Sequence, residues 1–491
     1  MIEPEEAALA VRQQRTRLLL LVGIVVALGA SIVMHLKLAA RRNAAEAGET
    51  EGPAARVRGA LADADRAVIN RDLGAAWTAL EEARGLLDEL IVAEPRNPDL
   101  GRARMVVARR LANVALERGQ GDVALDHLKD AYERAAGLHD ADPANDRARN
   151  DRAQVARVLA ESLRALPDPA GAAQVAEDAA QAIEGSVNGL NPNAALRTAL
   201  SDLWLDAARG HAALQAEGPA RANLARATEQ AFAAVPRAED PVGAQARLYG
   251  VLMTAAELCA GLLDEGNAEA YERQAVTVLE TRERLEAAAT DLPRLRAALL
   301  VRLSDRALKL GRPQQAKEDL ERSLALRRSW AEKQPGDAAL IMDVVRGYNH
   351  MGAFHSEAER DADALTAYAQ AVAWSEKLTG GGGRLRVLSL GNYSQLLGRL
   401  DRTREARAEA AKAYEAACAL RDGDPQADLD AAVAGLRYAR LLRARPGADK
   451  KRARAVTEAE QARARGWVGD KDLVRYKQTV EGLDALAGEL R

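Results

Sequence analysis

The 491-residue sequence has few of the residues that mark cross-linked or metal-binding proteins. Its two cysteines, Cys259 and Cys418, lie far apart and form no CxxC motif, so we expect neither a disulfide framework nor a thiolate metal site. Aromatic residues make up only 3 %, and no alternating β-branched runs predict strands. An alanine-rich chain of this kind favours helices that pack closely through small side chains.

Neither the charge distribution nor any sequence motif indicates nucleic-acid binding or catalysis. The net charge of −3 is spread along the chain, so no electrostatic case for nucleic acid arises. We find no Walker, HExxH, GxSxG or kinase motif, and no GxGxxG after a strand. His350 and His355 are five residues apart, which does not place them on one helical face. We therefore expect no enzymatic activity, no cofactor and no metal site.

Residues 18–36, LLLLVGIVVALGASIVMHL, have no acidic side chain and are close to the ~20 residues that span a bilayer as a helix. A cleaved signal peptide is the alternative, but its apolar core is usually shorter. We expect an uncleaved, single-pass helix in the inner cell membrane, with a short tail at 1–17 and a linker at 37–54. The flanking positive charges almost balance. We place the N-terminus in the cytoplasm and the rest outside it.

Small residues recur along the chain at three positions, which we name the first, second and third small positions, and the period in the numbering is 48. The first holds Ala64, Ala112, Ala160, Ala208, Ala256, Ser304 and Gly352; the second holds Ala76, Ala124, Ala172, Ala220, Ala268, Ala316 and Ala364; the third holds Ala83, Ala131, Ala179, Ala227, Ala275, Ser323 and Ala371. A further copy follows after a shorter step, with Ser394, Ala406 and Ala413. Seven successive matches at three positions indicate an internal repeat.

The spacing predicts a pair of helices in each copy. The second and third positions are seven residues apart, which is two helical turns and hence one face. Large residues fill the space between: Leu80, Leu128, Leu224, Leu320 and Tyr368 lie between the second and third positions, and Trp204, Leu252, Leu300 and Tyr348 precede the first. Glu272 interrupts this series without an evident reason.

Prolines and capping residues separate the copies. We expect Pro95, Pro143, Pro335 and Pro425 to stop the second helix of their copies. Asn97, Asn145, Asp337 and Asp428 follow closely and can cap the next helix. Residues 428–445 and 448–465 predict a degenerate ninth hairpin. The last amphipathic helix, 470–490, carries Leu473, Val480, Leu483, Leu486 and Leu490, and we expect it to cap the array.

Two segments resemble tetratricopeptide repeats (TPR): residues 308–324, LKLGRPQQAKEDLERSL, and 397–414, LGRLDRTREARAEAAKAY. The resemblance implies an all-α fold, a right-handed α-solenoid of about eight to nine TPR-like hairpins over 55–466, with a capping helix in 467–491. The copies are longer than the ~34 residues usual for the family. Long-unit members often accompany bacterial signalling proteins, including membrane-bound serine/threonine kinases.

The resemblance also implies a function, the binding of proteins or peptides in a concave groove lined by the first helix of each copy. Matched by register, the groove candidates are Arg109, Asn113, Arg157, Arg209, Arg346, Asn349, Asn392 and Gln395. Their side chains suit backbone and carboxylate groups of a peptide. We expect a membrane-anchored TPR scaffold whose partner the sequence does not name. The alternative is a sensory or regulatory domain that is related to kinase-associated TPR regions but lacks a kinase.

Overall fold

The structure is a computed structural model that describes residues 52–187, 192–286, 289, 291–378, 383–420, 425–443, 450–466 and 474–490. Every regular element in these residues is helical. The chain divides into two compact units between Asp264 and Glu265. The predicted membrane helix at 18–36 lies outside the described residues. Among the helices that are described, none is long and apolar enough to cross a bilayer.

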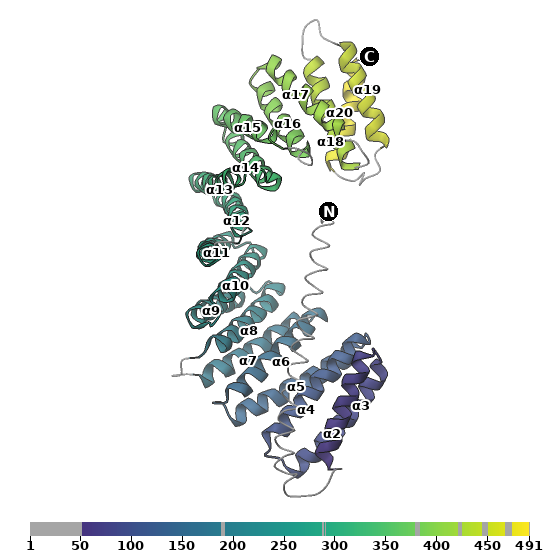
Figure 1. Cartoon of the computed structure of the whole chain (residues 1–491), viewed down its shortest axis with the longest axis vertical. Coiled ribbons are helices and arrows are strands. Elements are labelled where there is room, and N and C mark those ends of the chain that lie inside the picture. Colours follow the sequence, from purple (N-terminus) through teal and green to yellow (C-terminus); the bar gives the residue numbers. More distant parts are fainter. Residues whose placement is uncertain are drawn as a thin grey trace. The chain divides into compact units, whose positions relative to one another are not determined.

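Unit 1 consists of helical hairpins in which each helix packs on the next one along the chain (Figure 1). Its helices are α2 (Pro53–Ile69), α3 (Leu73–Ala93), α4 (Pro98–Glu117), α5 (Gly121–Ala141), α6 (Asp146–Ala165), α7 (Pro169–Ser186), α8 (Ala194–Ala213), α9 (Glu217–Ala234), the short 3₁₀ helix η1 (Val235–Arg237) and α10 (Pro241–Gly261). Even-numbered α-helices are the first helices of their copies, and odd-numbered ones are the second helices.

Unit 2 repeats this arrangement (Figure 1). It contains α11 (Glu265–Leu285), α12 (Leu292–Lys309), α13 (Pro313–Lys333), α14 (Ala338–Glu357), α15 (Asp361–Ser375), α16 (Gly383–Arg399), α17 (Thr403–Ala419), α18 (Pro425–Arg443), α19 (Lys450–Gly466) and α20 (Val474–Leu490). Helix α20 packs on α18 and α19, and its Leu483 and Leu486 are buried among their apolar residues. Each unit therefore fits the α-solenoid class.

The three small positions form the core of the hairpins, as the repeat predicts. All of them are buried, with at most 2 % of each alanine or serine exposed. The large residues between the second and third positions are buried too, from Leu80 at 0 % to Tyr368 at 6 % exposed. Alanine at a helix crossing lets two backbones approach closely while leucine fills the adjoining space. The prediction of a helical-hairpin repeat is confirmed for these residues.

Proline and capping residues end and begin the helices largely as expected. Helices α3, α5 and α13 each end two residues before a proline, at Ala93, Ala141 and Lys333. The side chains of Asn97, Asn145 and Asp337 accept hydrogen bonds from backbone N–H groups in the first turns of α4, α6 and α14.

The prediction for Pro425 and Asp428 is wrong. Helix α17 already ends at Ala419, and Pro425 is the first residue of α18. Asp428 lies inside the first turn of α18 and does not precede it. Proline suits the first helical position because its missing N–H would have no intrahelical acceptor there, and an acidic residue in the first turn complements the helix dipole.

The turn between the two helices of a hairpin uses a left-handed backbone conformation that recurs with the period of the small positions. Positive φ angles occur at Arg71, Gly119, Gln215, Leu263, Gly311, Glu359 and Asp401. Pro167 occupies the corresponding place between α6 and α7, where its ring excludes a positive φ. Two of the seven residues are glycine, so the other turns hold a side chain in a strained region.

Candidate interaction face of the first helices

The predicted groove residues lie on first helices, which contact one another directly within each unit. In unit 1, α8 packs against both α6 and α10; in unit 2, α16 packs against both α14 and α18. Together with ion pairs between α4 and α6 and between α12 and α14, this packing gives each unit a face of first helices, which we call the first-helix face. Side chains separated by one repeat period lie in rows across it, because neighbouring copies share one register.

Ion pairs join neighbouring first helices across this face. The Nε of Arg102 on α4 donates to Asp151 on α6 at 2.6 Å, and Arg294 on α12 does the same to Asp343 on α14 at 2.7 Å. Both pairs span 49 residues, one repeat plus one. Arg384 and Asp430 join α16 to α18 at 2.8 Å. The face is thus held together by polar contacts as well as by packing.

In unit 1, the predicted residues Arg157 and Arg209 pair with two carboxylates of α8, the partly buried Asp202 and the buried Asp206. Arg157 pairs with Asp202 at 2.7 Å, and Arg209 pairs with Asp206 at 2.9 Å. Burial raises the pKa of Asp202 above its usual value, against the opposing effect of Arg157. The side chains of Arg157 and Arg209 stay 46 % and 37 % exposed. Their guanidinium groups therefore remain available to a ligand.

The other two predicted residues of unit 1 are less open. Arg109 on α4 is partly buried; burial lowers its pKa, and the nearby Asp151 carboxylate opposes this effect. Asn113, one turn further along α4, is also partly buried. Glu161 and Glu257, which share the row of Asn113 and Arg209, are exposed. The face of unit 1 is consequently of mixed charge and not a purely basic strip.

In unit 2, the predicted residues fall into two groups. Arg346 and Gln395 are exposed, and Arg346 pairs with Asp343 at 3.0 Å. Asn349 is only 7 % exposed, and its Nδ2 donates to the Ser389 hydroxyl at 2.8 Å and to the Val345 carbonyl at 3.0 Å. Asn392 donates to the Oδ1 of Asn349 at 3.3 Å. These two amides bond mainly to each other and to α14 and α16.

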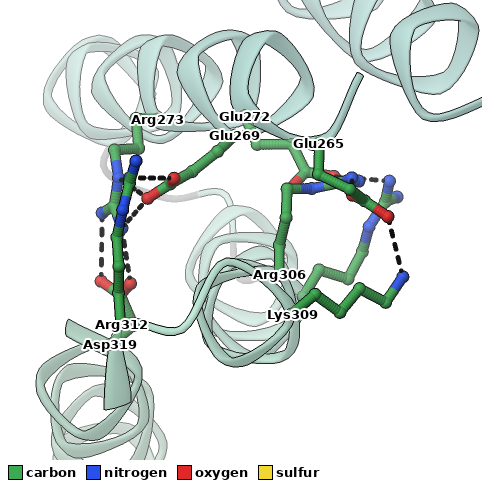
Figure 2. A network of polar contacts seen from close by, with 9 residues as sticks. Glu265, Glu269, Glu272, Arg273, Arg306, Lys309, Arg312 and Asp319 are labelled. Carbon is green, nitrogen blue, oxygen red and sulfur yellow. Dashed lines mark hydrogen bonds and ion pairs between the residues drawn. The ribbon is translucent and has the colours of Figure 1, made fainter. Parts of the chain in front are cut away.

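Sequence reasoning left Glu272 unexplained, and the structure supplies its partners. Glu272 on α11 is fully buried, and its carboxylate accepts from Arg302 at 2.7 Å and from two nitrogens of Arg306 at 3.0 Å (Figure 2). Hydrogen bonds to Glu272 raise the pKa of Arg306. The signal in the sequence was a carboxylate at a position that is leucine in four other copies. Its burial is understandable only because Arg302 and Arg306 bind it.

More ion pairs extend from Glu272 along α11 (Figure 2). Arg273 donates to Glu269 at 2.7 Å and to the fully buried Asp319 on α13 at 3.0 Å. Arg312 also donates to Glu269, at 2.7 Å. At the start of α11, Glu265 accepts from Arg306 and from Lys309. This network ties α11 to α12 and α13.

Among the described residues, no group of histidine, cysteine and acidic side chains could hold a metal ion. His355 is buried at 7 % exposure next to Phe354, whereas His350 is exposed on the same helix. Burial lowers the pKa of the His355 imidazole. The two histidines do not face each other, as their spacing predicts.

The sequence matches no family model and no curated protein. Among solved structures, the apo form of RapI is 9 % identical, covers 79 % of this chain and 98 % of its own, and gives a TM-score of 0.35. The C-terminal part of a TPR repeat-containing protein from Cytophaga hutchinsonii is 13 % identical. The match covers 64 % of this chain and 98 % of that one, with a TM-score of 0.32. NprR in complex with its cognate peptide NprX is 10 % identical. The match covers 68 % of this chain and 84 % of that one, with a TM-score of 0.27. All three TM-scores lie below 0.5, and we base no inference on them.

Proposed function

We propose that this protein is a TPR-like helical-repeat scaffold that binds a protein or peptide partner through its first-helix face. The proposal rests on one observation: hydrogen-bonding side chains recur in register on first helices that pack directly against one another. Arg157, Arg209 and Arg346 keep exposed guanidinium groups that carboxylates on first helices orient. Arginine held in this way suits recognition of partner carbonyl and carboxylate groups. The proposal includes no catalytic activity.

Arg346 and Arg328 give a matched pair of positions for a test. Both are arginines of unit 2, their side chains are 51 % and 49 % exposed, and each pairs with one acid on its own helix. Arg346 lies on the first helix α14, whereas Arg328 lies on the second helix α13. A photo-crosslinking amino acid at either site perturbs the fold to a similar degree.

We expect cross-linked adducts in living cells from position 346 and few from position 328. Gln395, also exposed on a first helix, provides a second test site. Adducts from both faces in equal yield, or from neither, would contradict the proposed face. Alanine substitution of Asn349 and Asn392 is a less informative test, because it also breaks the contact between α14 and α16.

The membrane anchor is a second, separable part of the proposal. It rests on the apolar sequence 18–36 and on the polar, small residues that follow it. With this anchor, the scaffold is tethered to the inner membrane with its repeats outside the cytoplasm. We expect the whole chain to resist extraction from membranes by alkaline carbonate. Deletion of 18–36 should abolish this resistance. The orientation is tested by adding protease to spheroplasts that carry a C-terminally tagged chain. We expect the protease to remove the tag; a protected tag would place the repeats in the cytoplasm.

A further inference from the structure

A pocket of about 520 Å³ opens in unit 1 between α8, α9, η1 and α10. This volume lies within the ~300–1,000 Å³ typical of small-ligand sites. Its walls combine methyl groups, such as those of Ala231 and Leu248, with the hydroxyls of Thr198 and Ser201. No residue of the predicted groove lines it. The pocket therefore contains none of the predicted groove residues, although Arg247 at its rim shares the Asp202 carboxylate with Arg157.

Helix α9, which lines the pocket, ends earlier than three of its counterparts, although α7 ends at the equivalent residue, Ser186. Helices α3, α5 and α13 end at Ala93, Ala141 and Lys333, which all correspond to position 237 when they are shifted by whole repeat periods. Helix α9 ends at Ala234, three residues earlier, and η1 takes the place of its last turn. Pro236 accounts for this, since proline lacks the N–H that a continuing α-helix needs.

Ser201 is the unusual residue of this pocket. At the same register position, six other copies hold an apolar, buried residue: Val57, Met105, Ala153, Ala297, Val345 and Val387. Ser201 is 1 % exposed, and its hydroxyl has no hydrogen-bond partner. A buried hydroxyl without a partner is costly to the fold, and an apolar residue in its place would avoid that cost. A ligand that forms a hydrogen bond with the Ser201 hydroxyl would supply the partner that the packed side chains do not.

The rim of the pocket carries charges of both signs. Arg237 and Arg247 are exposed there, as are Glu239 and Asp240. Arg247 reaches Asp202 only at 3.8 Å, and Asp240 already caps α10 by accepting from the N–H of Gly243. A purely anionic ligand would meet the carboxylate of Glu239, and a purely cationic one would meet the two guanidinium groups. A ligand with both charges satisfies both kinds of group.

We propose that this pocket binds a small zwitterion of amino-acid size. Its carboxylate faces Arg247 and the Ser201 and Thr198 hydroxyls, its ammonium faces Glu239, and its side chain packs on the alanines and Leu248. This inference does not depend on the function proposed for the first-helix face.

The test is calorimetric titration of the purified full chain with each of the twenty common L-amino acids at millimolar concentration. We expect saturable binding of at least one. The amine and the acid that share its side chain but lack its carboxylate or ammonium group should bind at least tenfold more weakly. Loss of one buried hydrogen bond in Ser201→Ala should weaken binding about three- to tenfold.

Ser304→Ala is the matched control. Ser304 is also buried in a first helix without a hydrogen-bond partner, but it does not line the pocket. Ala195→Trp, at an exposed lining position in the first turn of α8, should fill the mouth and abolish binding. The proposal is overturned if no amino acid binds saturably, if both singly charged analogues bind as well as the zwitterion, or if Ser201→Ala and Ala195→Trp leave the affinity unchanged.

Discussion

A Cβ atom on Gly352 would lie 2.5 Å from Cε1 of Tyr368, too close for any side chain. Gly352 occupies the first small position of α14, and Tyr368 occupies the large position of α15. In four other copies, this pair is alanine or serine against leucine, as in Ala64 with Leu80 and Ser304 with Leu320. Glycine at position 352 leaves the space that the Tyr368 ring occupies, so the sizes of these two residues depend on each other.

The variant Gly352→Ala should therefore lower the free energy of unfolding of unit 2 by about 1–3 kcal/mol, although alanine is the better helix former. Tyr368→Leu in the same chain should restore most of that loss, because it returns the pair to the combination of the other copies. Urea unfolding followed by circular dichroism measures both. Gly250→Ala is the control: its Cβ meets nothing within 4 Å, and it should be neutral or stabilising by up to ~1 kcal/mol.

Glu272→Leu introduces the leucine found in four other copies and should nevertheless destabilise unit 2 by about 3–5 kcal/mol. The substitution leaves the guanidinium of Arg306, whose side chain is 9 % exposed, without its main partner. Adding Arg306→Leu, which copies Leu258 at the same register, should recover much of the loss, and a double-mutant cycle measures the coupling. Additive effects of the two substitutions would show that the buried pair is not the reason for Glu272.

Glycine at a strained turn should stabilise the protein. Glu359 is exposed and has a φ of 55°, so Glu359→Gly removes an unfavourable backbone conformation at no cost in contacts. We expect a gain of about 1 kcal/mol in the free energy of unfolding, measured by denaturant titration. Gly311→Ala, at a φ of 70°, should cause a comparable loss. Equal stability of both variants and the parent would contradict the strain assigned to these turns.

His139 should make unit 1 sensitive to acid. The imidazole is 2 % exposed, Arg152 lies 3.0 Å from its Nδ1, and its Nε2 has no hydrogen-bond partner. Burial, and then the charges of Arg152 and Arg149, lower its pKa, against the effect of Asp140. The unfolded chain protonates this histidine near pH 6.5, whereas the folded chain does so only at lower pH. The free energy of unfolding is therefore unaffected above about pH 6.5. Below that pH it falls by at most ~1.4 kcal/mol per pH unit.

The variant His139→Val, which copies Val187 and Val235 at the same register, should remove this contribution. Its advantage over the parent in thermal unfolding should grow as the pH falls from about 7 to about 5. His139→Glu is a second probe, since Glu283 and Arg296 form an ion pair of 2.9 Å at the corresponding place in unit 2. Parallel pH profiles for parent and variants would rule out His139 as the source of acid sensitivity.

The hairpins were predictable because their determinants are local and repeated. Alanine at a crossing, as at Ala112 or Ala172, has the same neighbours in every copy, so the regular period identifies it from sequence. Capping by Asn97 or Asp337 involves only the next turn of backbone and is equally accessible. The error at Pro425 arose because proline fits both the end of one helix and the start of the next.

The candidate sites were less predictable because they depend on contacts between copies. Asn349 occupies a groove register, but Ser389 and Asn392 on the next first helix bury its amide. The pocket is lined by residues of α8, α9, η1 and α10, so the pattern within one copy does not reveal it. The division at Asp264 is not visible in the sequence either, because the small positions Ala256 and Ala268 continue the period across it.

The buried pair of Glu272 and its arginines also constrains how the gene can change. Tandem copies of similar length invite unequal recombination, which would lengthen or shorten the array by one hairpin. An exchange that placed α11 before any first helix other than α12 would bury the Glu272 carboxylate without Arg302 and Arg306. Such recombinants would fold poorly. The ion pairs between adjacent copies thus give each hairpin a fixed neighbour and oppose drift in the number of repeats.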